Sequence, residues 1–346
     1  MITKDYADFS WQQAEQLLSI DSPTGYTDYA ALWLKSSFEM LGFSASITTK
    51  GGILVDLGGE KENDALLLAA HTDTLGAMVA EVKGNGRLRL TPLGGMNPNN
   101  AEAENVRIYT RGGKVLEGTF QLCNASIHVN GDYNAAKRGF DNMEVVLDED
   151  VKSAADAKAL GIEVGDIVCF DPRTRRTASG YLKSRFLDDK LSVGILLGFA
   201  RYIADNHITL SRKTYIHVTV YEEVGHGGSG SLPAGVTEAI SVDMGCVGSG
   251  LSCTERQVSI CAKDSGGPYS YQVVGKLIEA AKKMEADYAV DVYPYYGSDV
   301  EATLRAGFDI RHGLIGPGVY ASHGYERSHI DGVWSTLKVL CGYLDC

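Results

Sequence analysis

Ala65-Leu66-Leu67-Leu68-Ala69-Ala70 is a continuous apolar run that leads directly into His71-Thr72-Asp73. A run of this length without polar alternation is typical of a strand that is buried on both faces of a sheet. His71 and Asp73 then lie at the carboxyl end of that strand, which is where ligands of open α/β sheets gather. The stretch therefore predicts an α/β fold with a candidate site at the end of this strand.

Helical and strand-like segments alternate on both sides of this stretch. Before it, Ser10 and Gln13 form a candidate capping box for a first helix, and a second helix is predicted over residues 30–41. After it, we predict helices over 191–203 and 271–284 and after Gly332, and strands over 215–221, 239–243 and 258–262. This alternation favours a mixed sheet flanked by helices.

The middle of the chain has a different pattern. Between residues 80 and 176, short alternating β segments are separated by turns such as Gly84-Asn85-Gly86 and Gly112-Gly113. We therefore predict two domains. Residues 1–79 and 177–346 form an α/β domain, and residues 80–176 form an inserted β-rich domain.

Composition excludes several classes of protein. The 346 residues carry a formal net charge of -12, which disfavours binding to a nucleic-acid phosphate backbone. No apolar stretch is long enough to cross a bilayer, and the amino terminus lacks the pattern of a secretory signal, so we expect a soluble cytoplasmic protein. The seven cysteines lack CxxC spacing, which fits reduced thiols better than a disulfide framework or a structural zinc site.

Acidic residues and histidines follow predicted buried segments at five places. These are His71-Thr72-Asp73, Asp188-Asp189, Glu222-Glu223, Asp243 and His323. Burying several carboxylates together costs free energy unless a cation compensates their charge, and a dinuclear metal site supplies that compensation. Each motif alone is a weak signal, but their order along the chain strengthens the hypothesis.

The residue types suit metal-assisted hydrolysis. One carboxylate can bridge two cations, histidines and further carboxylates complete the ligand sets, and the metals lower the pKa of bound water. Asp73 can orient the imidazole of His71, as metal-bound histidines usually require. In the pair Glu222-Glu223, one carboxylate can bind metal while its neighbour accepts the proton of the attacking water.

With these motifs the sequence resembles the tetrahedral aminopeptidases and their glutamyl and deblocking relatives, over essentially the whole chain. The resemblance rests on Ala70 to Gly76, Leu187-Asp188-Asp189-Lys190, Glu222-Glu223-Val224-Gly225, Val242-Asp243-Met244 and Tyr320-Ala321-Ser322-His323. Supporting signals are Ser22-Pro23-Thr24-Gly25, Leu93-Gly94-Gly95, the segment 161–166 and Gly297-Ser298-Asp299. The implied fold is an aminopeptidase-like (phosphorylase/hydrolase-like) mixed sheet flanked by helices, with a small β-barrel-like insertion.

The same resemblance implies roles for individual residues. Asp188 would bridge two divalent metal ions; His71 and Asp243 would complete one ion, and Glu223 and His323 the other. Glu222 would be the general base and Asp73 the partner of His71. Zinc is the expected metal, with cobalt and manganese as alternatives. The resemblance also implies a dodecamer whose insertion serves oligomerisation and access.

Some features depart from the family pattern. Thr74 stands where a glutamate is common, Asp189-Lys190 replaces Asn-Arg, and a glycine-rich segment, His226 to Gly230, follows Gly225. His226 and His329 remain open, since His226 fits either a substrate contact or a solvent-facing loop and His329 competes with His323 as a ligand. His217 fits a core position, and His128 in the insertion stays unassigned. Lys263, Arg305 and Arg311 could each favour an acidic substrate side chain.

The predicted function is a metal-dependent aminopeptidase that removes residues from the amino ends of short peptides. A metal-dependent deacylase of small N-acyl compounds would use the same ligands. A glycoside hydrolase would need only two carboxylates and no metal. A non-catalytic binding shell is the last alternative, although all the expected ligand and base positions are filled.

Overall fold

The computed structural model describes residues 2–346, and the chain divides into two compact units. One unit comprises the chain as far as Asp73 together with Arg173–Cys346, and the other is Thr74–Pro172. The expected boundaries, 79/80 and 176/177, lie a few residues further along. The first differs because the barrel strand β4 (Gly76–Val82) already begins at Gly76, and the second because β10 (Arg175–Arg176) pairs with β11 (Tyr181–Ser184) of the larger unit.

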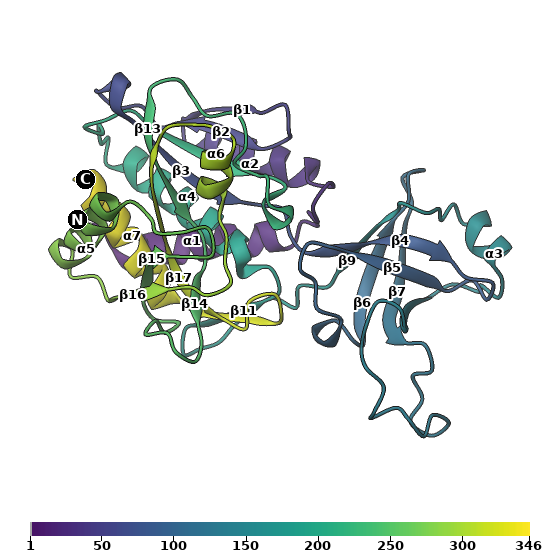
Figure 1. The fold of residues 1–346 in the computed structure, drawn as a ribbon. Coiled ribbons are helices and arrows are strands. Elements are labelled where there is room, and N and C mark those ends of the chain that lie inside the picture. Colours follow the sequence, from purple (N-terminus) through teal and green to yellow (C-terminus); the bar gives the residue numbers. More distant parts are fainter. Residues whose placement is uncertain (1) are drawn as a thin grey trace. The chain divides into compact units, whose positions relative to one another are not determined.

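The larger unit is built on a 12-stranded mixed sheet (Figure 1). Its main path runs β1-β2-β12-β3-β13-β17-β18-β11-β10, with β14 and β15 on β17 and β16 on β15. Besides β10 and β11, the strands are β1 (Ser44–Ile47), β2 (Ile53–Asp56), β3 (Ala65–His71), β12 (Thr214–Thr219), β13 (Val236–Val242), β14 (Gly245–Val247), β15 (Val258–Lys263), β16 (Tyr288–Val292), β17 (Arg311–Tyr320) and β18 (Glu326–His329).

The central strands β12, β3, β13 and β17 are mutually parallel. Every residue of β3 is buried, as its continuous apolar sequence predicts. Because parallel strands point the same way, their carboxyl ends meet at one edge of the sheet. The residues that follow these strands are therefore brought together.

Helices pack against this sheet and against one another. They are α1 (Lys4–Leu18), α2 (Asp28–Met40), α4 (Leu187–Asp205), α5 (Tyr271–Lys283), α6 (Asp299–Arg305) and α7 (Ile330–Leu344), with the short 3-10 helices η1 (Glu62–Asp64) and η3 (Glu222–Val224). The prediction that Ser10 caps the first helix was wrong. Ser10 lies in the middle of α1, fully buried, and its hydroxyl donates to the Tyr6 carbonyl at 2.8 Å.

The smaller unit is a closed six-stranded barrel in the order β4-β5-β8-β7-β6-β9. Besides β4, its strands are β5 (Leu88–Leu93), β6 (Glu104–Tyr109), β7 (Val115–Leu122), β8 (Met143–Leu147) and β9 (Ile167–Phe170), and it carries η2 (Pro98–Asn100) and α3 (Ala154–Ala159). Buried and exposed residues alternate along β7, and Phe120 packs edge to face on Phe170 inside. The predicted fold class, a mixed α/β sheet with a barrel-like insertion, is confirmed.

All helices between residues 2 and 346 are too short or too polar to span a bilayer.

Candidate metal centre

The strand ends deliver four of the five predicted ligands to one place. His71 is the last residue of β3, η3 with its two glutamates follows β12, Asp243 follows β13, and His323 follows β17. The parallel register sets the strand ends side by side, with His71 opposite Thr219 of β12. The fifth residue, Asp188, comes from the start of α4.

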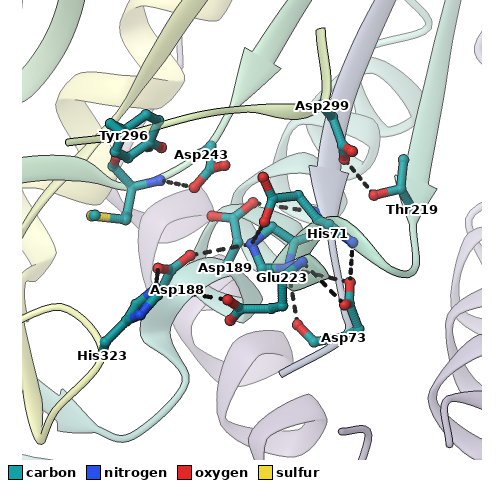
Figure 2. A network of polar contacts seen from close by, with 12 residues as sticks. His71, Asp73, Asp188, Asp189, Thr219, Glu223, Asp243, Tyr296, Asp299 and His323 are labelled. Atoms are coloured by element: carbon teal, nitrogen blue, oxygen red, sulfur yellow. Dashed lines mark hydrogen bonds and ion pairs between the residues drawn. The ribbon is translucent and has the colours of Figure 1, made fainter. Parts of the chain in front are cut away.

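The five side chains form two groups that share one carboxylate (Figure 2). In the first group, donor atoms of His71, Asp188 and Asp243 all lie within 4.8 Å of one another. Asp188, Glu223 and His323 meet the same limit in the second group. The Nε2 atom of His71 is 3.2 Å from Oδ1 of Asp188. Oδ1 of Asp188 thus lies beside His71 of the first group, and Oδ2 lies on the side of His323 of the second group.

His323, not His329, faces this cluster. Its Nε2 atom is 3.6 Å from Oδ2 of Asp188 and 3.7 Å from Oε2 of Glu223. His329 instead caps α7, since its Nδ1 accepts the Asp331 amide at 3.0 Å and its Nε2 donates to the Ser179 carbonyl at 2.8 Å. The two histidines are only six residues apart along the chain, but they point to different parts of the structure.

Asp73 connects His71 to the two glutamates. The Nδ1 atom of His71 donates to the backbone carbonyl of Asp73 at 2.9 Å, while the Asp73 carboxylate lies further away, at 3.6 Å. That carboxylate accepts the backbone amides of Glu222 and Glu223 at 3.1 and 3.3 Å, and the Thr24 hydroxyl at 2.7 Å. Asp73 therefore orients the imidazole mainly through its backbone and the glutamate turn through its side chain.

The charges of the cluster fit a divalent cation. Burial, reinforced by the neighbouring Asp188, raises the pKa of Glu223 well above its usual value, and the same two causes raise the pKa of Asp243 to about 7. Within residues 2–346, Oδ1 of Asp189 and Oε1 of Glu223 are buried without a hydrogen-bond partner. Carboxylate oxygens that lack protein partners, next to the imidazole nitrogens of His71 and His323, make a donor set of the kind that zinc and similar cations bind.

Two buried acids support the cluster although the sequence assigned them no role. Oδ2 of Asp189 accepts the backbone amide of His71 at 3.2 Å. Oε1 of Glu326 accepts the His323 amide and Oε2 accepts the Asp188 amide, both at 3.0 Å. The polar richness of the segment after His323 was a visible signal for Glu326, but only the tertiary structure reveals which backbone amides it contacts.

A cavity of about 610 Å³ opens beside the cluster. Its lining includes Glu222, Ser265, Tyr295, Ser298 and Arg305 in addition to the acidic ligand candidates. The cavity is large enough for an amino-acid side chain and the adjoining peptide group.

Of the three cationic residues considered for substrate contact, Arg305 lines the cavity. Its Nη1 also lies 3.5 Å from Oε2 of Glu301. Lys263 instead donates to the Asp264 carbonyl at 2.8 Å, and Arg311 pairs with Glu238 at 3.2 Å.

The other histidines have separate surroundings. The ring of His226 stacks on Tyr221, with ring centres 5.1 Å apart. His217 is buried within β12, in agreement with its predicted core position, and His128 is exposed in the smaller unit.

Comparison with known proteins supports the resemblance noted from sequence. The family model for M42 glutamyl aminopeptidase matches residues 51–339. The Bacillus subtilis protein named "Putative aminopeptidase YhfE" is 43% identical over 330 residues, 95% of each chain.

Solved structures share the fold. The TET aminopeptidase from Thaumarchaeota archaeon SCGC AB-539-E09 gives a TM-score of 0.88 at 17% identity, covering 98% of this chain and 96% of that one. The Pyrococcus horikoshii TET1 peptidase gives 0.85 at 20% identity, covering 97% and 99%. The family match and the relative that aligns along almost the whole chain lead to one conclusion: this chain belongs to the M42 glutamyl aminopeptidase family of metal-dependent aminopeptidases.

Proposed function

We propose that this chain is a dinuclear metallo-aminopeptidase that cleaves single residues from the amino ends of short peptides. The observation that carries the proposal is the pair of three-residue donor groups that share Asp188. In this assignment His71 and Asp243 hold one ion, Glu223 and His323 hold the other, and Asp188 contributes to both. When bound, two such ions activate water and stabilise the charge that develops on the scissile carbonyl.

Glu222 is the proposed general base. Its carboxylate lies 3.7 Å from Nε2 of His71, on the cavity side of the cluster, and its backbone is held by Asp73. Burial raises its pKa well above the usual value, which makes the carboxylate a stronger base than one in water. Glu222 accepts the proton of the attacking water and returns it to the leaving amine.

The surplus of buried acids supports a peptide with a free amino end as the substrate. Four further carboxylates lie in or beside the cavity. Glu222 and Asp299 line it, and the buried Asp73 and Asp189 lie next to the ligand candidates. Such a negative field attracts a protonated α-amine and gives no advantage to an N-acylated substrate, which lacks that charge. This feature favours an aminopeptidase over a deacylase.

Replacing Glu222 by Gln tests the central assignment. We expect kcat for an aminoacyl p-nitroanilide to fall by about two to four orders of magnitude, because the amide cannot accept the proton. Two bound ions per chain should remain, as measured by plasma mass spectrometry. Glu163→Gln, at an exposed position of the smaller unit, is the matched control. Full activity of Glu222→Gln would remove this residue from the role of base.

A substrate panel separates the alternatives. We expect cleavage of aminoacyl but not of N-acetylated p-nitroanilides, loss of activity in EDTA, and recovery with zinc, cobalt or manganese. A glycoside hydrolase would keep its activity in EDTA. Because Arg305 lines the cavity, glutamyl substrates should be cleaved better than lysyl ones.

We further propose that the chain forms a homo-oligomer in the cytoplasm. The proposal is supported by the fold, since the similar TET1 peptidase of Pyrococcus horikoshii assembles into a tetrahedron or a large octahedral shell. Light scattering on the purified protein should give about twelve times the 37.2 kDa of one chain. A mass of 37.2 kDa at working concentration contradicts the assembly.

A further inference from the structure

The glycine-rich segment Gly225–Gly230 begins three residues after the proposed base Glu222. The Gly225 amide donates to the Glu222 carbonyl at 2.7 Å, and the His226 amide donates to the Tyr221 carbonyl at 3.1 Å. Tyr221 and Gly225 both have positive φ angles, 70° and 84°. The conformation of Tyr221–Glu222 is therefore tied to the position of the segment that follows it.

One side of this segment rests on α6. The Thr303 hydroxyl donates to the Gly228 carbonyl at 2.8 Å. A Cβ atom on Gly227 would overlap Oδ1 of Asp299, and one on Gly228 would overlap the Asp299 carbonyl. Glycine is required here because the backbone of the segment lies directly against α6.

Lys50 holds the other side. It lies in the turn between β1 and β2, which is closed by the bond from the Thr48 amide to the Gly52 carbonyl at 2.8 Å. Its ammonium donates to the carbonyls of His226 and Gly227, the second at 3.0 Å, and lies 3.3 Å from the Ser229 hydroxyl. A lysine ammonium has three donors, so these acceptors can all be satisfied together.

The surroundings of this ammonium act on its pKa in opposite directions. Burial lowers the pKa of Lys50, and the nearby carboxylates of Asp299 and Asp73 oppose that shift. The hydrogen bonds of Lys50 go to the segment, and the carboxylates of Asp299 and Asp73 act on it through their charge. Methionine at this position would fill similar space without donating to any of the carbonyls.

We infer that Lys50 is a positioning residue for Glu222, which it serves by fastening the segment Gly225–Gly230 between the β1–β2 turn and α6. The inference rests on the proposed function, because it assigns Lys50 to the placement of the proposed base. A segment with four glycines has many alternative backbone conformations, and the contacts of Lys50 select one of them. Misplacement of a catalytic group by about 1 Å can cost about a hundredfold in rate.

Three variants of the full-length, metal-loaded protein test this role. Lys50→Met removes the donors, Lys50→Arg keeps a charged donor, and Lys213→Met is the matched control. Lys213 pairs with Asp56 of the same hairpin at 2.7 Å, at the end away from the turn that carries Lys50. The measurements are kcat and KM on an aminoacyl p-nitroanilide, ion content, and hydrogen exchange of the amides in 222–230.

In Lys50→Met we expect amide exchange in 222–230 to become at least about tenfold faster, and kcat to fall at least about tenfold while KM changes by less than about threefold. Ion content should stay at the wild-type level, because Lys50 contacts none of the ligand candidates. Lys50→Arg should recover a large part of both losses. Lys213→Met should match the wild type in exchange and kcat.

Unchanged exchange in Lys50→Met overturns the inference, whatever its activity. So does faster exchange with an unchanged kcat, since the segment would then be loosened without moving the base. If the wild-type protein cleaves no aminoacyl substrate with any metal, the proposed function fails and with it the role assigned to Lys50. Amide hydrogen exchange in 222–230 would then still show whether Lys50 fastens the segment. A failure of the proposed function can thus be distinguished from a failure of the contact between Lys50 and the segment.

Discussion

His71 and His217 are both buried on adjacent strands, yet their surroundings shift their pKa values in opposite directions. Burial by itself lowers the pKa of each imidazole. Around His71, the carboxylates of Glu222 and Asp188 outweigh burial and raise the pKa well above its usual value. For His217, burial together with the charge of Lys50 lowers the pKa to about 4. The charged groups near each histidine therefore distinguish the candidate ligand His71 from the core residue His217.

His217 should make the fold sensitive to acid. Its folded pKa is about 4, below the usual value of 6.5, so the unfolded chain binds more protons between these values and stability falls as pH decreases through them. Between pH 7 and pH 5, the free energy of unfolding should fall by about 2 kcal/mol more in the wild type than in His217→Asn. Urea unfolding at the two pH values measures the difference.

The control for this experiment is His207→Asn, at an exposed position with a φ of 49°, which asparagine tolerates. It should lose as much stability as the wild type. Equal acid sensitivity of the wild type and His217→Asn would show that His217 is not the group that titrates.

At the scale of elements, the contact between α1 and α4 positions the helix that carries the shared ligand candidate Asp188 at its amino-terminal end. The two helices approach closely where Gly194 and Gly198 of α4 face Ser10 of α1. A Cβ on Gly198 would overlap the Ser10 hydroxyl oxygen and lie 3.0 Å from the Tyr6 carbonyl. Small residues on both helices therefore set the distance between them.

Gly198→Ala should destabilise the folded state by about 1–3 kcal/mol, because the added methyl group forces the helices apart. Gly275→Ala is the control within α5, where the new Cβ meets no atom within 4 Å. That substitution should be neutral or stabilise by up to about 1 kcal/mol, since alanine favours helix. Denaturant midpoints measure both, and an equal response of the two variants contradicts the close packing of α1 and α4.

At the scale of the whole molecule, folding concentrates negative charge. The chain has 44 acidic and 32 basic residues, and several of the surplus carboxylates converge at the ends of the parallel strands. A cation that binds there does so only in the folded state, because the ligand candidates come from distant parts of the sequence. Metal binding and folding stability should therefore be linked.

Removal of metal should lower the melting temperature. An ion at a hundred times its Kd stabilises the folded state by about 2.7 kcal/mol, so EDTA should lower Tm by several degrees. Asp188→Asn, which affects both donor groups, should melt at the same temperature with and without EDTA. His323→Ala removes a ligand candidate from one donor group only. EDTA should therefore still lower the melting temperature of this variant, but by less than that of the wild type. The same melting temperature of the wild-type protein in zinc and in EDTA would contradict the metal assignment.

The sequence alone predicted the fold class and the positions of the candidate ligands along the chain. The apolar run that ends at His71 and the one that ends before Asp243 are local patterns. A strand that is buried on both faces of a parallel sheet can be recognised from such a run alone. The polar residues that follow these runs could be recognised as candidate ligands because they lie directly after the predicted strands.

Tertiary structure decided which of these residues meet. His323 lies shortly after β17 and His329 is the last residue of β18, but only the packing of α7 makes His329 a helix cap. The backbone bonds of Glu326 and the contacts of Lys50 join segments that are far apart along the chain. No local pattern encodes such contacts, because they depend on strand register and helix packing across the folded sheet.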